Sequence, residues 1–131
     1  MSSSVAELAV APLAGRRVLI VEDEYFLADD LAHALRALGA EIIGPTGEFN
    51  EARQFLNISS AIDGALLDIN LRNEMIFPLA RELRVRRVPF TFTTGYDRTS
   101  LPSDLRDVPI WEKPLNIQAV ARSLADDILR R

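Results

Sequence analysis

The stretch GALLDIN, residues 64–70, is a short apolar run that ends in polar residues. A continuous apolar run of this length is typical of a strand buried on both faces, as in a parallel sheet. The strand is expected to end in the acidic residue Asp68. In open α/β sheets, ligands bind outside the carboxyl ends of the strands. The run therefore predicts a parallel sheet with a carboxylate at its ligand-binding edge.

Strands and amphipathic helices alternate on both sides of this run. The expected strands are residues 16–21, 41–44, 64–70, 89–95 and 109–112. The expected helices are residues 24–39, 49–59, 77–87 and 116–131, with Pro78 in the first turn of the third and Asn116 as the N-cap of the last. Residues 96–108, rich in Pro, Ser, Asp and Arg, allow no more than a turn or two of helix. This order predicts a doubly wound α/β fold with five parallel strands and a shortened fourth helix.

The composition excludes several classes of protein. The chain has 131 residues, the length of one domain, and a net charge of -4, which argues against a nucleic-acid or anionic-membrane surface. It has no cysteine and one histidine, so thiolate sites and sites with two imidazoles are excluded. Residues 1–15 lack a basic segment, so we expect a loose tail or short helix, a domain over 16–131 and a cytoplasmic location.

Four of the expected strands end in polar side chains. The first ends in Glu22 and Asp23, the third in Asp68, the fourth in Thr94 and the fifth in Lys113. Carboxylates held close together repel one another unless a cation shares their site. Mg²⁺ (or Mn²⁺) prefers such oxygen ligands and commonly binds phosphate as well. The pattern therefore predicts a metal and phosphoryl site at the carboxyl edge of the sheet.

Each of these side chains suits a separate part of phosphoryl chemistry. Asp68 is positioned to attack phosphorus, and Thr94 and Lys113 each suit one phosphoryl oxygen. The alternation in FTFTT (residues 90–94) favours Thr94 over Thr93. Lys113 is the one lysine among 15 basic residues, and an ammonium is a compact point charge where a guanidinium is a wide planar fork.

Four short motifs, VLIVEDE, GALLDIN, TFTTGY and EKP, occur in order at these strand ends. In this combination the chain resembles the receiver domain of two-component response regulators, from Arg16 to about Arg130. The resemblance implies a flavodoxin-like (CheY-like) fold in which Asp68 accepts a phosphoryl group from a histidine kinase or histidine phosphotransferase. It also implies a cis bond between Lys113 and Pro114.

The resemblance further assigns the metal ligands and the switch residues. Asp23, Asp68 and the backbone carbonyl of Asn70 would bind Mg²⁺, and Glu22 would reach the metal through water. Thr94 and Lys113 would contact the phosphoryl oxygens.

The chain also departs from the usual receiver pattern. The segment after Asp68 lacks the customary proline and Asp-Gly turn, and Ile110 stands where an aromatic switch residue is usual. Together with FTFTTGY, these traits resemble an atypical branch named for a Phe-Ala-Thr-Gly-like signature, with Thr93 in place of the alanine. Members of this branch are often paired with kinases of the HWE or HisKA2 type.

Several residues allow two interpretations. The Asn70 amide either caps a loop or orients water during dephosphorylation, and Tyr96 either shields the phosphoryl group or is a plain surface residue. Tyr25 and Phe26 either contact the kinase or pack under the neighbouring loop. We expect Glu24 to be the first-turn acid of the helix over residues 24–39, where the helix dipole favours it. Residues that we expect to be solvated on their helices are His33, Arg81, Arg84, Arg86 and Arg87.

The leading hypothesis is a stand-alone signalling switch that acts by protein contact and catalyses only its own phosphorylation and dephosphorylation. A receiver fragment of a larger protein remains an alternative. A second hypothesis is a receiver-like interaction module that works without phosphorylation. A third is an aspartate-nucleophile phosphohydrolase, although such enzymes carry an Asp-x-Asp motif on the first strand, where this chain has Glu-Asp-Glu.

Overall fold

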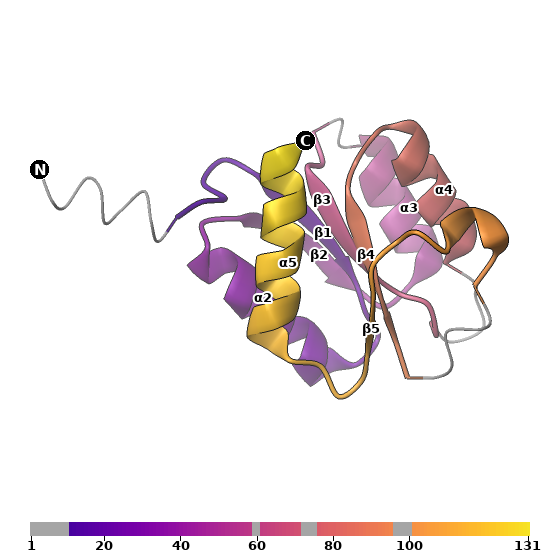
Figure 1. Cartoon of the computed structure of the whole chain (residues 1–131), viewed down its shortest axis with the longest axis horizontal. Helices are drawn as coiled ribbons and strands as arrows, with labels where there is room; N and C mark the ends of the chain where they lie inside the picture. The colour runs from indigo at the N-terminus through magenta and orange to yellow at the C-terminus, as the bar shows by residue number, and fades with distance from the viewer. Residues whose placement is uncertain (1–10, 59–60, 72–75, 96–100) are drawn as a thin grey trace, which may run out of the picture.

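Five parallel strands form one sheet in the order β2-β1-β3-β4-β5 (Figure 1). The computed structural model describes residues 11–58, 61–71, 76–95 and 101–131. The strands are β1 (Arg17–Val21), β2 (Glu41–Thr46), β3 (Gly64–Asp68), β4 (Phe90–Thr94) and β5 (Ile110–Glu112). The predicted doubly wound, CheY-like α/β fold is therefore confirmed.

Four helices cover the two faces of the sheet. They are α2 (Tyr25–Ala37), α3 (Phe49–Ile58), α4 (Phe77–Val85) and α5 (Ile117–Arg130). Helices α2 and α5 lie on one face, and α3 and α4 lie on the other (Figure 1). As predicted, Pro78 lies in the first turn of α4, and the Asn116 side chain caps α5 by accepting a hydrogen bond from the Ala119 amide at 3.1 Å.

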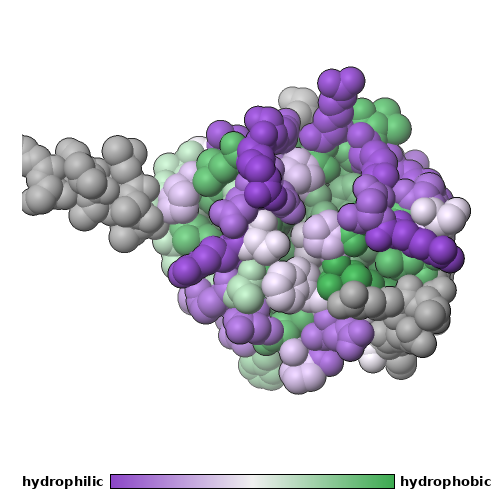
Figure 2. Space-filling model, in the orientation of Figure 1, coloured by the Kyte–Doolittle hydropathy of each residue, from purple (hydrophilic) through white to green (hydrophobic). Residues whose placement is uncertain are grey.

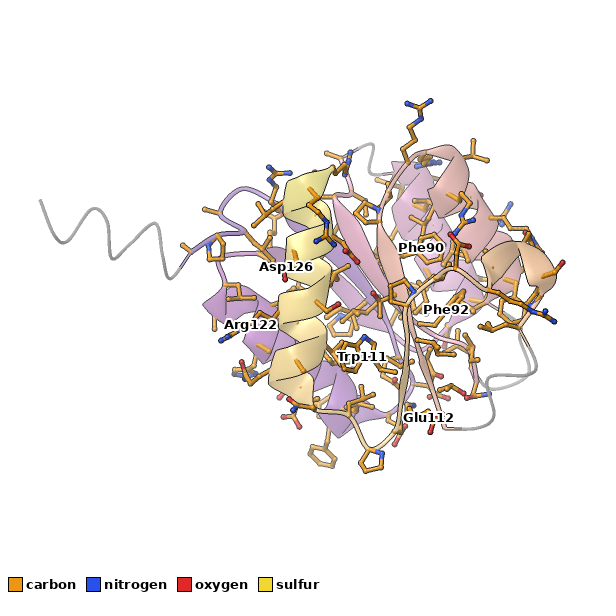
Figure 3. The ribbon with its side chains drawn as sticks, in the orientation of Figure 1. Phe90, Phe92, Trp111, Glu112, Arg122 and Asp126 are labelled. Carbon is orange, nitrogen blue, oxygen red and sulfur yellow. The ribbon has the colours of Figure 1, made fainter. Side chains whose placement is uncertain are left out.

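Alternation along the strands divides the apolar core into two clusters. Every residue of β3 and β4 is buried, which is why these segments read as continuous apolar or β-branched runs. Leu67 and Phe92 face α3 and α4, whereas Leu66 faces α2 and α5. Trp111 packs on the α5 side of the sheet (Figure 3). Outside the core, hydrophilic side chains line the outer surface of α5 (Figure 2).

The packed body of the protein begins before the predicted boundary at Arg16. Leu13 is fully buried, and its amide donates a hydrogen bond to the carbonyl of Leu38 at 2.8 Å. Gly39 has a φ of 99° in the same contact, and a Cβ there would lie 2.9 Å from the Ala14 nitrogen. At least Leu13 therefore belongs to the core, while residues 1–10 lie outside the described part of the chain.

The connection between β4 and β5 is described over residues 101–109. This part contains one 3-10 helix, Ser103–Leu105, and no α-helix, which agrees with the predicted shortage of helix there. Arg81 pairs with Asp104 at 3.0 Å and Arg84 with Asp107 at 3.1 Å. These two arginines were expected to be merely solvated; instead they attach the connection to α4.

Among the described residues, no helix is both long and apolar enough to cross a membrane.

Candidate functional site

The carboxyl ends of β1, β3, β4 and β5 meet at one edge of the sheet. Val21 pairs with Leu67, so the residues that follow them, Glu22 and Asp68, lie side by side; Asp68 is the last residue of β3 and pairs with Thr93 of β4. The Lys113 amide donates a hydrogen bond to the Thr94 carbonyl at 2.8 Å, which extends the ladder between β4 and β5 by one residue. The parallel register therefore brings the four predicted strand-end positions to a common edge.

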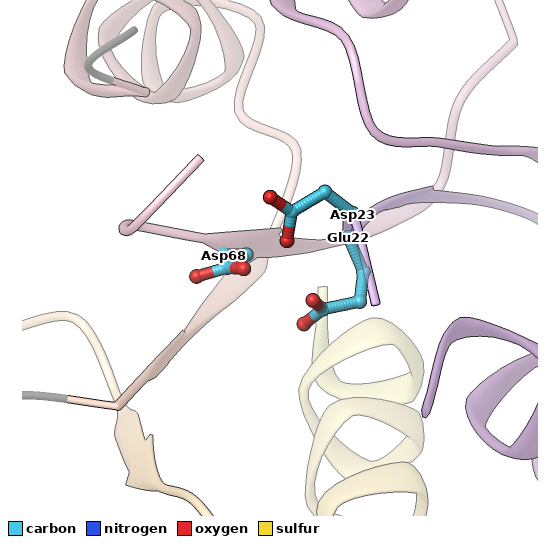
Figure 4. A group of neighbouring side chains, drawn as sticks. All are labelled: Glu22, Asp23 and Asp68. Atoms are coloured by element: carbon cyan, nitrogen blue, oxygen red, sulfur yellow. The ribbon is translucent and has the colours of Figure 1, made fainter. Parts of the chain in front are cut away.

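Three carboxylates form a cluster at this edge. Oxygen atoms of Glu22, Asp23 and Asp68 all lie within 4.8 Å of one another (Figure 4). The side chains of Glu22 and Asp68 are each 1% exposed, and Asp23 is more open to solvent. In Figure 4 the three carboxyl groups turn toward a shared space. The cluster thus combines two deeply buried carboxyl groups with one accessible carboxylate.

The pKa of Glu22 is raised in this cluster. Burial raises the pKa of Glu22 to about 8, and the neighbouring charge of Asp68 contributes to the same shift. Its Oε2 accepts hydrogen bonds from the Glu24 amide at 3.0 Å and from Lys113 at 3.2 Å. Its buried Oε1 also lies 3.2 Å from Lys113 Nζ but makes no hydrogen bond among the described residues. Glu22 therefore offers one oxygen that a cation or a proton would satisfy.

Lys113 contacts three carboxylates from two sides of the cluster. Its Nζ lies 3.2 Å from Asp68 Oδ2, 3.2 Å from Glu22 Oε2 and 2.5 Å from Glu24 Oε2. Burial lowers the pKa of Lys113, but the hydrogen bond to Glu24 and the charges of Asp68 and Glu22 outweigh it, so the net pKa lies above its ordinary value. The ammonium is therefore firmly charged and already in contact with Asp68.

Glu24 contacts the site, and its assignment as the first-turn acid of its helix was wrong. Glu24 is the N-cap residue of α2, it makes no side-chain capping bond, and its carboxylate turns to Lys113. The available signal was the unbroken Glu-Asp-Glu run at the end of β1. The sequence showed three adjacent acids but not which of them the lysine would reach.

The Asn70 side chain joins the ends of β3 and β4. Its Oδ1 accepts hydrogen bonds from the Thr94 hydroxyl and from the Gly95 amide, both at 2.9 Å. The backbone amide of Asn70 donates to Asp68 Oδ1 at 2.8 Å. Thr94 is fully buried, so its hydroxyl lies inside the strand end beside Asn70. The sequence suggested a loop-capping role for Asn70 but did not reveal the contact with Thr94.

The donor set suits a hard divalent cation. Carboxylate oxygens close together, one of them without a hydrogen bond, are the ligands that Mg²⁺ takes in proteins. The excess of negative charge is also suitable, because Lys113 is the one cation that contacts Glu22, Glu24 and Asp68 among the described residues. The residues present therefore fit a magnesium site.

The remaining predicted residues are not members of the carboxylate cluster or lie outside the described chain, although Tyr25 lines a pocket with Glu22 and Asp23. Tyr25 and Phe26, at the start of α2, are 74% and 80% exposed, with ring centroids 5.3 Å apart. Packing under a neighbouring loop, one of the two interpretations, is therefore wrong for both. His33 is exposed, as expected. Tyr96 lies outside the described residues.

Comparison with known proteins identifies the family. The chain is 35% identical to SdrG from Sphingomonas melonis Fr1, whose solution structure superposes with a TM-score of 0.73 over 87% of this chain and 96% of that one. It is also 32% identical over 93 residues to the transcriptional regulatory protein PdtaR of Mycobacterium tuberculosis, which covers 70% of this chain. The chain belongs to the response-regulator receiver family.

The other comparisons concern the fold and the extent of the chain. A response regulator receiver protein from Sinorhizobium medicae WSM419 is 21% identical and shares the fold, with a TM-score of 0.74 over 87% of this chain and 94% of that one. No protein-family model matches the chain. This receiver domain spans about half the length of the curated relatives that it matches.

Proposed function

We propose that this receiver domain accepts a phosphoryl group on Asp68 from a histidine kinase or a histidine phosphotransferase and then acts by protein contact. One observation carries the proposal. The buried Asp68 carboxylate lies at the carboxyl edge of the sheet, 3.2 Å from the ammonium of the chain's one lysine and within 4.8 Å of two other acids. Receiver domains as a class receive phosphoryl groups from histidine kinases, which gives the donor.

The residues around Asp68 supply the rest of the chemistry. A carboxylate oxygen of Asp68 would attack phosphorus, forming an O–P bond as the P–N bond of the donor breaks and its electron pair returns to the imidazole. Lys113, already in contact with Asp68, would follow one phosphoryl oxygen, and the Thr94 hydroxyl would donate to another. These groups neutralise charge where it accumulates during transfer.

The metal would be held by residues of the acidic cluster. Asp23, Asp68 and the backbone carbonyl of Asn70 are the proposed direct ligands of Mg²⁺ (or Mn²⁺), with Glu22 reaching it through water. When bound, the metal ion would neutralise the phosphoryl oxygens during transfer. The unsatisfied Oε1 of Glu22 supports this assignment, because a metal-bound water would supply its missing hydrogen bond.

The finer assignments follow from the sequence and the neighbouring surface. The FTFTTGY motif and the low helix content of residues 101–109 support the atypical Phe-x-Thr-Gly-Tyr branch, and with it a kinase of the HWE or HisKA2 type. We propose Tyr25 and Phe26 as the kinase contact, since both are exposed next to Glu24. Tyr96 as a modulator of dephosphorylation, and a cytoplasmic location, remain predictions.

A related protein supports the choice of probe. One structure of SdrG, reported from Pseudomonas melonis Fr1, is described as its BeF3-activated conformation; it is 35% identical, with a TM-score of 0.69 over 88% of this chain and 98% of that one. Beryllofluoride imitates a phosphoryl group on a carboxylate. The same reagent is therefore suitable for this chain.

The decisive experiment is phosphorylation by a small donor. The protein is incubated with acetyl phosphate and Mg²⁺, and its intact mass is measured beside that of Asp68→Ala. We expect a stoichiometric, base-labile phosphoryl adduct in the wild type and none in the variant. Asp63→Ala is a matched control, because Asp63 immediately precedes β3, at the opposite end of the strand from Asp68, where its Oδ2 accepts a hydrogen bond from the Arg17 amide at 2.8 Å.

The two alternatives give different results in the same tube. A phosphorylation-independent interaction module would show no adduct with acetyl phosphate or with any kinase tested. A phosphohydrolase would consume acetyl phosphate steadily without accumulating an adduct. Either result would overturn the proposal, as would an adduct that persists in Asp68→Ala.

A further inference from the structure

The Thr94 hydroxyl is already engaged before any phosphoryl group arrives. It donates its proton to Asn70 Oδ1 at 2.9 Å, and the Gly95 amide donates to the same oxygen at 2.9 Å. A threonine hydroxyl has one proton to donate. Thr94 therefore cannot donate to Asn70 and to a phosphoryl oxygen on Asp68 at the same time.

The position of Asn70 makes this competition direct. Its backbone amide is bonded to Asp68 Oδ1 at 2.8 Å, so the residue connects the carboxyl group that would carry the phosphoryl group with the hydroxyl that would sense it. Thr94 is fully buried and lies in the ladder opposite Glu112, so its backbone is held in place. The Thr94 hydroxyl must therefore break its hydrogen bond to Asn70, by a local side-chain movement, before it can donate to a new acceptor.

We propose that the Asn70 side chain acts as a latch. It holds the Thr94 hydroxyl in the unphosphorylated protein and so determines how readily that hydroxyl moves to a phosphoryl oxygen on Asp68. This inference rests on the proposed phosphorylation of Asp68. Asn70 is a positioning residue here, since it acts through Thr94. A charged phosphoryl oxygen is a stronger acceptor than a neutral amide oxygen, so phosphorylation releases the latch. The Gly95 amide is exposed and takes water as its new partner.

The latch makes a quantitative prediction for binding of a phosphoryl mimic. In Asn70→Ala the hydroxyl starts free of Asn70, so uptake of beryllofluoride no longer costs that hydrogen bond. We expect binding of beryllofluoride with Mg²⁺ to become roughly three- to tenfold tighter, as for loss of one competing hydrogen bond. Beryllofluoride does not turn over, so an effect of Asn70 on dephosphorylation does not enter the measurement.

Two backgrounds test whether Asn70 acts through the hydroxyl. The substitution Asn70→Ala is made in the wild type, in Thr94→Ser, which keeps the hydroxyl, and in Thr94→Val, which removes it. We expect the gain in affinity to persist in the serine background and to vanish in the valine background. In the absence of beryllofluoride, Asn70→Ala should also lose the hydrogen-exchange protection of the Gly95 amide, which reports the latch itself.

Each result supports the latch or overturns it. If the wild type binds beryllofluoride and Asn70→Ala, folded by its melting temperature, binds it equally or more weakly, the latch is wrong while the proposed function stands. An equal gain in the valine background also overturns it, because Asn70 would then act by another route. If the wild type itself binds no beryllofluoride, the proposed function fails first, and the switching role of Asn70 fails with it.

Discussion

The Lys113 ammonium lies 2.5 Å from Glu24 and 3.2 Å from Asp68, so the partly exposed acid is the nearer partner. The Glu24 side chain is 60% exposed, whereas that of Asp68 is 1% exposed. Water therefore screens the pair with Glu24 more strongly than the pair with Asp68. Glu24 therefore keeps the ammonium near the exposed side of the site, but the ion pair is weak enough to be broken readily.

This arrangement predicts a mild gain from removing the charge of Glu24. In Glu24→Gln the ammonium loses a competing partner and turns more fully to Asp68 and to its phosphoryl group. We expect phosphorylation by acetyl phosphate to become up to about threefold faster, because exposed ion pairs are worth little. The measurement is the initial rate of adduct formation by mass, with Glu51→Gln on the exposed face of α3 as a control. A slower rate in Glu24→Gln alone would contradict the competition.

Lys113→Arg is expected to impair phosphorylation despite keeping the positive charge. The Lys113 side chain is 16% exposed and its single nitrogen serves three carboxylates that converge within 3.2 Å. A planar guanidinium is wider and cannot occupy that point. We expect the rate of phosphorylation by acetyl phosphate to fall by roughly tenfold or more, since a hydrogen bond to a charged group is lost. Full activity in the variant would show that charge alone suffices.

The affinity for Mg²⁺ should rise with pH because of Glu22. Its folded pKa of about 8 lies above the ordinary value of 4.5, so at neutral pH the metal must displace a proton from the cluster. We expect the apparent Kd for Mg²⁺ to fall by up to about tenfold per pH unit between about pH 6 and about pH 8. Calorimetric titration at several pH values measures this slope. In Glu22→Gln the slope should flatten.

The same pKa predicts how the metal-free protein responds to pH. A raised pKa means that the folded state holds a proton which the unfolded state has lost, so this contribution to the free energy of unfolding is fully present below about pH 4.5 and disappears as pH rises to about 8. Mg²⁺ should remove this loss by stabilising the ionised form. Urea unfolding with and without Mg²⁺ at both pH values tests it; parallel pH profiles would contradict it.

The Arg84–Asp107 pair should order the connection between β4 and β5. Arg84 donates to both carboxylate oxygens of Asp107 at 3.1 Å and to the Asp104 carbonyl at 3.0 Å. We expect Arg84→Asp to speed hydrogen exchange of the Leu105 and Val108 amides and to lower the melting temperature by a few degrees at most, since the pair is exposed. The double reversal Arg84→Asp with Asp107→Arg should restore protection. No recovery would assign the effect to Arg84 packing on Phe90 instead.

Much of the site could be predicted because a parallel sheet converts chain order into position. Each of Asp68, Thr94 and Lys113 falls at or just after the end of a strand, and parallel strands bring those ends to one edge. The burial of β3 and β4 could also be predicted, because both segments are continuous runs of apolar and β-branched residues. The cis bond before Pro114, implied by the family resemblance, is also present.

Only the tertiary structure decided which partners these side chains take. Glu22, Asp23 and Glu24 are adjacent in sequence, yet one is buried with a raised pKa, one opens to solvent and one turns to a lysine 89 residues away. The pairing of Asn70 with Thr94 likewise joins two strand ends 24 residues apart. Local sequence determines where a strand ends, but burial and charge at its end depend on neighbours that only folding brings together.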